Sequence, residues 1–92
     1  MRLTLIGRSY CHLCEAMRAE LNAALISAGG AGESVEIVEI DLDAYPALED
    51  RFSELVPVLL LGETETGVEI CHYHFDRLRW TSATGLAFGD RS

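Results

Sequence analysis

The chain has 92 residues, 49% of them hydrophobic, a size and composition that fit one packed domain rather than a disordered segment. Fifteen acidic residues against seven basic ones give a formal net charge of -8, which argues against nucleic-acid phosphates or anionic lipid as partners. No stretch approaches the roughly 20 apolar residues of a membrane span, and the apolar run at residues 3–6 is too short for a signal peptide, so we expect a cytoplasmic protein.

The first half of the chain predicts a strand, a long helix and a second strand. Residues 2–6 are apolar and partly β-branched and end at Gly7, which is typical of a strand. From Cys11 or His12 onward, apolar residues recur every three or four positions and predict a helix that ends at the glycines of residues 29–32. Its expected buried stripe consists of Leu13, Met17, Leu21, Ala24, Leu25 and Ala28.

The second half predicts a short helix, a hairpin and a last helix. Residues 35–42 form the second strand, whose apolar residues on both faces predict a sheet covered on both sides. Residues 46–52 predict a short helix with Pro46 in its first turn. Strands at 58–61 and 68–71 flank a polar turn, and a last helix begins near Phe75 or Asp76. The order βαβαββα predicts an α/β sandwich, a four-stranded mixed sheet whose first two strands are parallel and whose faces both carry helices.

Two cysteines, Cys11 and Cys14, stand at the junction between the first strand and the first helix. The free N–H groups and the dipole of a helix N-terminus favour the thiolate, which is the nucleophile of disulfide exchange. Cys14 falls about one turn from Cys11 on the same helix face, within reach for a disulfide. Arg8 adds positive charge, as does His12 when protonated.

A zinc site is the alternative use of such a pair. Zinc sites usually need a second pair of ligands, whereas a Cys-x-x-Cys that opens the first helix of a β-α-β unit is the redox arrangement. We therefore favour redox chemistry for Cys11 and Cys14.

Two segments resemble the glutaredoxins of the thioredoxin superfamily, and in particular the small bacterial glutaredoxin-like proteins. They are the stretch RSYCHLC at residues 8–14 and the later Val56-Pro57 directly before the apolar strand at 58–61. Glutaredoxins carry a basic residue three positions before the first cysteine, an aromatic residue just before it, and a Val-Pro that opens the third strand. The resemblance implies one glutaredoxin-type, thioredoxin-like domain over residues 1–92.

The resemblance also implies roles for individual residues. Cys11 would be the nucleophile of a thiol–disulfide oxidoreductase, and Cys14 would resolve the mixed disulfide. Pro57 would be cis and packed against the disulfide, with the backbone of Val56 pairing to an extended substrate. The alternative for Pro57 is a trans proline at the start of a strand.

Three more residues are candidates for substrate binding. Arg8 would hold a substrate carboxylate, and the alternative is a solvated surface charge. Tyr10 would line the substrate groove, and the alternative is a packing role. His12 lies between the two cysteines, beside the nucleophile.

For ligands, the resemblance implies a protein or low-molecular-weight disulfide as substrate and glutathione as a candidate co-substrate. We expect no metal and no bound cofactor beyond the redox-active disulfide, and we expect a monomer. The chain departs from the glutaredoxin pattern at His12-Leu13, which replaces Pro-Tyr, and at Leu55, which replaces Thr before the Val-Pro. The Gly-Gly that holds the γ-glutamyl end of glutathione is also absent, and CHYH stands at residues 71–74 in its place.

Residues 71–74 allow two interpretations. In a sheet with the strand order second-first-third-fourth, the end of the fourth strand lies about 10 Å from the cysteine pair, so Cys71, His72 or His74 could complete a zinc or iron–sulfur site with it. The interpretation we favour makes Cys71 a small buried apolar residue and the histidines ordinary loop residues. A third hypothesis for the whole chain is a redox-inert interaction domain with a thioredoxin fold.

Overall fold

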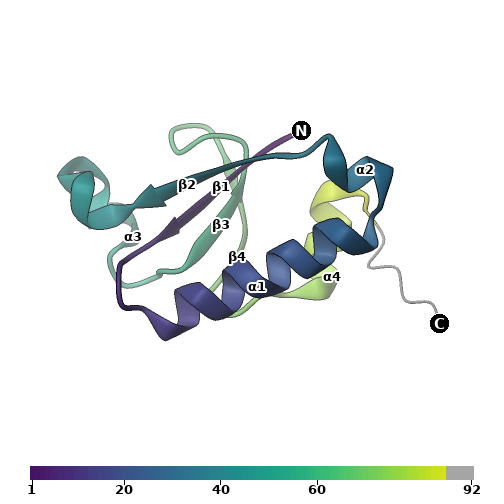
Figure 1. The fold of residues 1–92 in the computed structure, drawn as a ribbon. Helices are drawn as coiled ribbons and strands as arrows, with labels where there is room; N and C mark the ends of the chain where they lie inside the picture. Colours follow the sequence, from purple (N-terminus) through teal and green to yellow (C-terminus); the bar gives the residue numbers. More distant parts are fainter. Residues whose placement is uncertain (87–92) are drawn as a thin grey trace.

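The computed structural model describes residues 1–86, in which a four-stranded mixed sheet is flanked by helices (Figure 1). The strands are β1 (Arg2–Gly7), β2 (Glu36–Asp41), β3 (Val58–Leu61) and β4 (Val68–His72). Their order in the sheet is β2-β1-β3-β4, with β1 parallel to β2 and antiparallel to β3. β3 and β4 form the predicted antiparallel hairpin. The predicted fold class and strand order are confirmed, while residues 87–92 of the expected domain lie outside the described residues.

Helices cover both faces of this sheet, as the sequence predicts. The main helix α1 (His12–Ser27) and the last helix α4 (Arg77–Thr84) lie on one face, where Met17, Leu21 and Trp80 pack against Leu3 and Leu59. The other face is covered by two 3-10 turns, η1 (Leu42–Ala44) and η2 (Pro46–Leu48), and by α3 (Glu49–Phe52).

The side chains of β1 alternate between these two cores. Leu3 and Leu5 belong to the core under α1 and α4, whereas Ile6 belongs to the core under η1 and α3. Alternation is the normal consequence of a strand, whose successive side chains point to opposite faces. The two central strands β1 and β3 are therefore buried on both faces.

The sequence predictions were wrong in three places. Leu13 is 41% exposed because the inward position in the first turn of α1 is taken by its neighbour Cys14. β2 has no buried residue because it is an edge strand. Its apolar residues on both faces therefore do not show that helices cover this strand on both sides. A short helix α2 (Gly30–Glu33) follows the positive φ of Gly29, where we expected only a helix end.

The last helix begins at Arg77, directly after its predicted start near Phe75 or Asp76. Asp76 is its N-cap, and its Oδ1 accepts the backbone N–H of Arg79 at 3.0 Å. Gly85 ends it with a φ of 76°, in the left-handed region that favours glycine. Within residues 1–86 no helix combines the length and the apolarity that a bilayer span requires.

Candidate active site

Cys11 is the N-cap residue of α1. Its backbone is extended, and its Sγ accepts a hydrogen bond from the backbone N–H of Cys14 at 3.1 Å. The first-turn N–H groups of a helix have no intrahelical acceptor, so this sulfur takes the place of the usual capping oxygen. In the reduced protein the same donor would stabilise negative charge on Cys11 Sγ.

The sulfur atoms of Cys11 and Cys14 lie at disulfide-bonding distance. Their Cα atoms are 5.2 Å apart, within the usual range for a disulfide. Cys11 is partly exposed, whereas Cys14 is only 4% exposed. The predicted proximity of the pair is confirmed, and its two sulfurs differ in access, one facing solvent and one facing the protein.

Gly7, the last residue of β1, lies against Cys14 on its inner side. A Cβ at Gly7 would be 3.0 Å from Cys14 Sγ and 3.2 Å from Cys14 Cβ, closer than ordinary van der Waals contact. The absence of a side chain at Gly7 therefore lets the end of the strand approach the inner sulfur.

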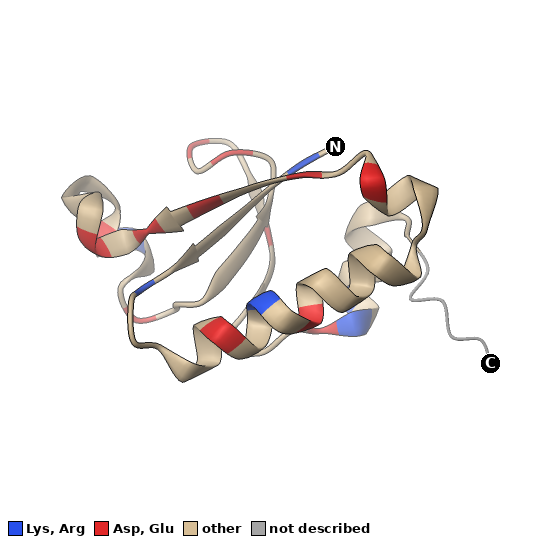
Figure 2. Ribbon diagram, in the orientation of Figure 1, with Lys and Arg blue, Asp and Glu red and all other residues tan. Residues whose placement is uncertain are grey.

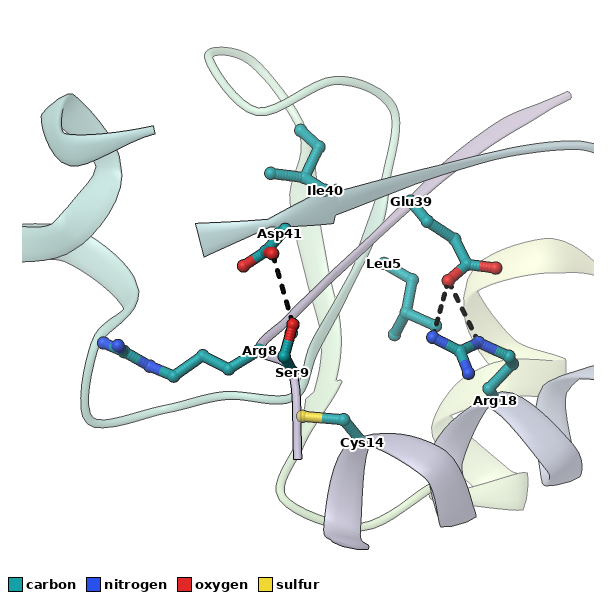
Figure 3. A pocket seen from close by; sticks show the side chains of 9 residues that line it. Leu5, Arg8, Ser9, Cys14, Arg18, Glu39, Ile40 and Asp41 are labelled. Atoms are coloured by element: carbon teal, nitrogen blue, oxygen red, sulfur yellow. Dashed lines mark hydrogen bonds and ion pairs between the residues drawn. The ribbon is translucent and has the colours of Figure 1, made fainter. Parts of the chain in front are cut away.

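A pocket of about 280 Å³ opens next to Cys14, between the ends of β1 and β2 and the first turns of α1 (Figure 3). It is lined by Leu5, Gly7, Arg8, Ser9, Cys14, Arg18, Glu39, Ile40 and Asp41. Arg18 crosses from α1 to Glu39 on β2, with Nη2 2.8 Å and Nε 3.0 Å from Oε1. The pocket is thus lined by the sulfur-bearing Cys14 on one side and by the Arg18–Glu39 ion pair on another.

Arg8 follows β1 and is bound on two sides by carboxylates of its own chain. Its Nη1 donates to Asp43 Oδ1 and its Nη2 to Glu49 Oε2, each at 2.6 Å, and the Arg8 side chain is only 29% exposed. The hydrogen bond to Glu49 and the charges of Glu49, Asp43 and Asp41 raise the pKa of Arg8. A substrate carboxylate at Arg8 would compete with these two carboxylates for the guanidinium.

The segment before β3 has the cis peptide bond that the resemblance implies, between Val56 and Pro57. The trans alternative for Pro57 is therefore wrong. Pro57 is buried and Val56 partly exposed. The Pro57 carbonyl accepts the backbone N–H of Tyr73 at 2.9 Å, which fixes the loop after β4 to this segment.

Tyr10 and His12 flank Cys11 in the chain and are exposed. Tyr10 is fully exposed, with a φ of 59°, so the packing alternative for it is wrong. His12 is exposed in the first turn of α1. Both residues are therefore exposed next to Cys11 in the chain, and their substrate-binding roles stay predictions.

Cys71 is buried in β4, with 3% of its surface exposed, in the core that contains Leu59 and Trp80. Burial raises the pKa of its thiol. His72 pairs instead with Glu69, Nδ1 to Oε2 at 2.7 Å. In the described part of the chain no three His, Cys, Asp or Glu side chains come together as a metal site would require. The structure thus offers the zinc or iron–sulfur hypothesis no ligand set among residues 1–86.

Gly7, Asp43 and Glu49 shape this site, and none of them was predicted to belong to it. A usable signal was the parallel pairing of the first two strands, because the carboxyl ends of parallel neighbours meet at one edge of the sheet. Gly7 is paired with Asp41 in that register, which brings Arg8 next to the acidic segment after β2. Nothing local in the sequence indicates that Glu49 binds Arg8.

Comparison with known proteins agrees with this geometry. The family model Glutaredoxin-like domain (DUF836) matches residues 2–80. The chain belongs to this glutaredoxin-like family. No curated protein matches the sequence.

Solved structures share the fold of this chain. Protein Ne2328 from Nitrosomonas europaea is 28% identical, with a TM-score of 0.70 over 90% of this chain and 89% of that one. Protein XcR50 from X. campestris is 34% identical, with a TM-score of 0.58 over 88% and 96% of the two chains. Mitochondrial thioredoxin 3 from Saccharomyces cerevisiae, in its oxidized form, is 17% identical with a TM-score of 0.60 over 92% and 74%, and shares the fold. The protein is thus a glutaredoxin-like domain with a thioredoxin fold and a cysteine pair at disulfide distance.

Proposed function

We propose that this glutaredoxin-like domain is a thiol–disulfide oxidoreductase in which Cys11 is the nucleophile and Cys14 the resolving thiol. The observation that carries the proposal is the asymmetric placement of the pair at the start of α1. Cys11 is partly exposed and its sulfur accepts an N–H bond, while Cys14 is buried directly behind it. The outer sulfur is accessible to a substrate, and the inner one is held for the second step.

The reaction balances with no further reagent. The Cys11 thiolate attacks one sulfur of the substrate disulfide, a mixed disulfide forms, and the other substrate sulfur leaves as a thiolate that takes up a proton. The Cys14 thiol then loses its proton and attacks Cys11 Sγ, which releases the second substrate thiol. The substrate gains two electrons and two protons, and the Cys11–Cys14 dithiol becomes a disulfide.

Substrate binding is assigned to the surface around Cys11. Tyr10 and Leu13 are large exposed side chains next to the nucleophile in sequence, and they suit contact with a protein or small-molecule disulfide. Val56, at the cis peptide bond, is the candidate for main-chain pairing with an extended substrate. We propose no bound cofactor, and a cytoplasmic site of action in which reductants regenerate the dithiol.

The test is a redox titration of the whole protein. The protein is equilibrated in dithiothreitol and glutathione redox buffers, quenched with an alkylating agent, and analysed by mass spectrometry. We expect a reversible Cys11–Cys14 disulfide that is absent in Cys11→Ser and retained in the control Cys71→Ser. Reduction of hydroxyethyl disulfide by the protein should fall to the uncatalysed rate in Cys11→Ser only. A wild-type protein that forms no internal disulfide at any buffer ratio would contradict the mechanism.

A further inference from the structure

Arg8 is a cation at the redox site that does not face the substrate freely. A guanidinium is the natural receptor for a substrate carboxylate because it presents parallel N–H donors. Here one terminal nitrogen is engaged by Asp43 and the other by Glu49. The arginine that lies nearest in sequence to Cys11 is therefore already bonded within the protein.

The charges around Arg8 leave an excess of negative charge. Three carboxylates, those of Asp41, Asp43 and Glu49, act on one guanidinium. Figure 2 shows the corresponding acidic positions at the end of β2 and around α3, beside the basic position at the end of β1. The other arginine of the pocket, Arg18, is paired with Glu39. The Arg8 cluster, defined as Arg8, Asp41, Asp43 and Glu49, thus presents a net negative charge to an approaching molecule.

We propose that Asp43 and Glu49 are specificity-determining residues that withhold Arg8, so that the site favours neutral and cationic disulfides over anionic ones such as glutathione disulfide. This inference rests on the proposed function and narrows its substrate class. A substrate carboxylate would compete with two carboxylates already bonded to Arg8 and would approach excess negative charge, whereas an ammonium group would be attracted. The negative charge of the Arg8 cluster therefore sets substrate preference in two ways: it repels anionic disulfides and attracts cationic ones.

The experiment compares three small disulfides that differ in charge. The fully reduced protein is mixed with cystamine, hydroxyethyl disulfide or glutathione disulfide, and the second-order rate constant is divided by that of a free dithiol with the same compound. The wild-type protein should rank cystamine above hydroxyethyl disulfide and hydroxyethyl disulfide above glutathione disulfide. The double variant Asp43→Asn/Glu49→Gln should raise the ratio of glutathione disulfide to hydroxyethyl disulfide about tenfold at low salt, and added salt should shrink the gain.

Two controls test whether a change in the rate ratio comes from the Arg8 cluster or only from a change in net charge. The variant Glu33→Gln/Glu65→Gln removes the same number of charges from exposed positions outside the pocket and should leave the ratio unchanged. Adding Arg8→Gln to the double variant should remove the gain, because no released guanidinium remains. Arg77 and Arg79 line a separate pocket on the β4–α4 side and stay unaltered in every variant.

The outcomes distinguish the inference from the proposed function. A ratio that does not move in the double variant, a gain that survives Arg8→Gln, or an equal gain in the Glu33/Glu65 control would overturn the inference while the exchange reaction stands. If even hydroxyethyl disulfide fails to react with the reduced wild-type protein, the proposed function falls and the inference with it. The single variant Asp43→Asn, which keeps the Glu49 pair, should give an intermediate ratio and guards against a folding defect in the double variant.

Discussion

The region around Cys11 and the region around Cys71 place the same side chain in opposite surroundings. Cys11 caps a helix, is partly exposed, and has a backbone N–H and a second cysteine at its sulfur. Cys71 lies in the interior of β4, is nearly inaccessible, and has a raised pKa because burial disfavours its charged form. Position in the fold, more than residue type, therefore decides which thiol is suited to redox chemistry.

The difference arises from where each cysteine stands along the chain. Cys11 follows the point where the chain leaves the sheet and enters α1, so it meets unpaired N–H groups. Cys71 is opposite Leu59 in the β3–β4 ladder, and its side chain points into the core under α1 and α4. A substrate can reach the first region without any change in the fold, whereas the second requires opening of the core.

The largest effect we expect is in thiol alkylation of the reduced protein. Iodoacetamide should modify Cys11 at least about 100-fold faster than Cys71, because a buried thiol reacts only through opening of the structure. Quenched time points with peptide mass spectrometry give both rates. In urea, where the core is open, the two rates should approach each other. Comparable native rates would contradict the contrast between the two regions.

A methyl group at Gly7 should disturb the pair without touching Cys71. The added Cβ would press on Cys14, so we expect Gly7→Ala to lower the free energy of unfolding by about 1–3 kcal/mol, the usual cost of overpacking. Gly30→Ala is the matched control, because no atom lies within 4 Å of a Cβ there. Urea unfolding of the oxidised variants measures both. Equal stability of the two variants would show that the strand end has room to move.

The smallest effect is a pH dependence that belongs to Cys71. Burial raises its pKa above the ordinary 9.0, so the unfolded chain ionises first as the pH rises. The unfolded state then binds fewer protons than the native state, and stability is full below pH 9 and declines as the pH rises toward the native pKa. Urea unfolding of the oxidised protein from pH 7 to pH 10.5 should show this decline, and Cys71→Ala should lack that component. Parallel curves for the two proteins would mean that burial does not shift the thiol.

Much of the fold follows from patterns that are local in sequence. The strands at 58–61 and 68–71 and the starts of α1 and α4 each depend on neighbouring residues and were predicted close to their observed bounds. The position of β2 at the edge of the sheet could not be predicted in this way, because its apolar composition suits a central strand equally well. The exposure of Leu13 depended on which of two adjacent residues, Leu13 or Cys14, turns inward, which the spacing alone left open.

In the candidate site, too, features local in sequence could be predicted and long-range contacts could not. Cys11 and Cys14 lie three residues apart in one short motif, so their proximity could be predicted from the sequence. The partners of Arg8 could not, since Asp43 and Glu49 come from segments 35 and 41 residues away that fold over the end of β1. The role of Gly7 likewise depends on how closely β1 approaches α1, a distance that only tertiary packing sets.

The hydrogen bond from Tyr73 to the Pro57 carbonyl has a consequence for how a partner chain would be aligned. Proline has no N–H to give, and the Pro57 oxygen already receives the Tyr73 donor. A peptide laid along this loop would therefore find at Pro57 no donor and an acceptor that is already in use. The alignment of such a peptide relative to the sulfur of Cys11 would be set at one residue, Val56, and a shift by a single position would leave its main chain without a match.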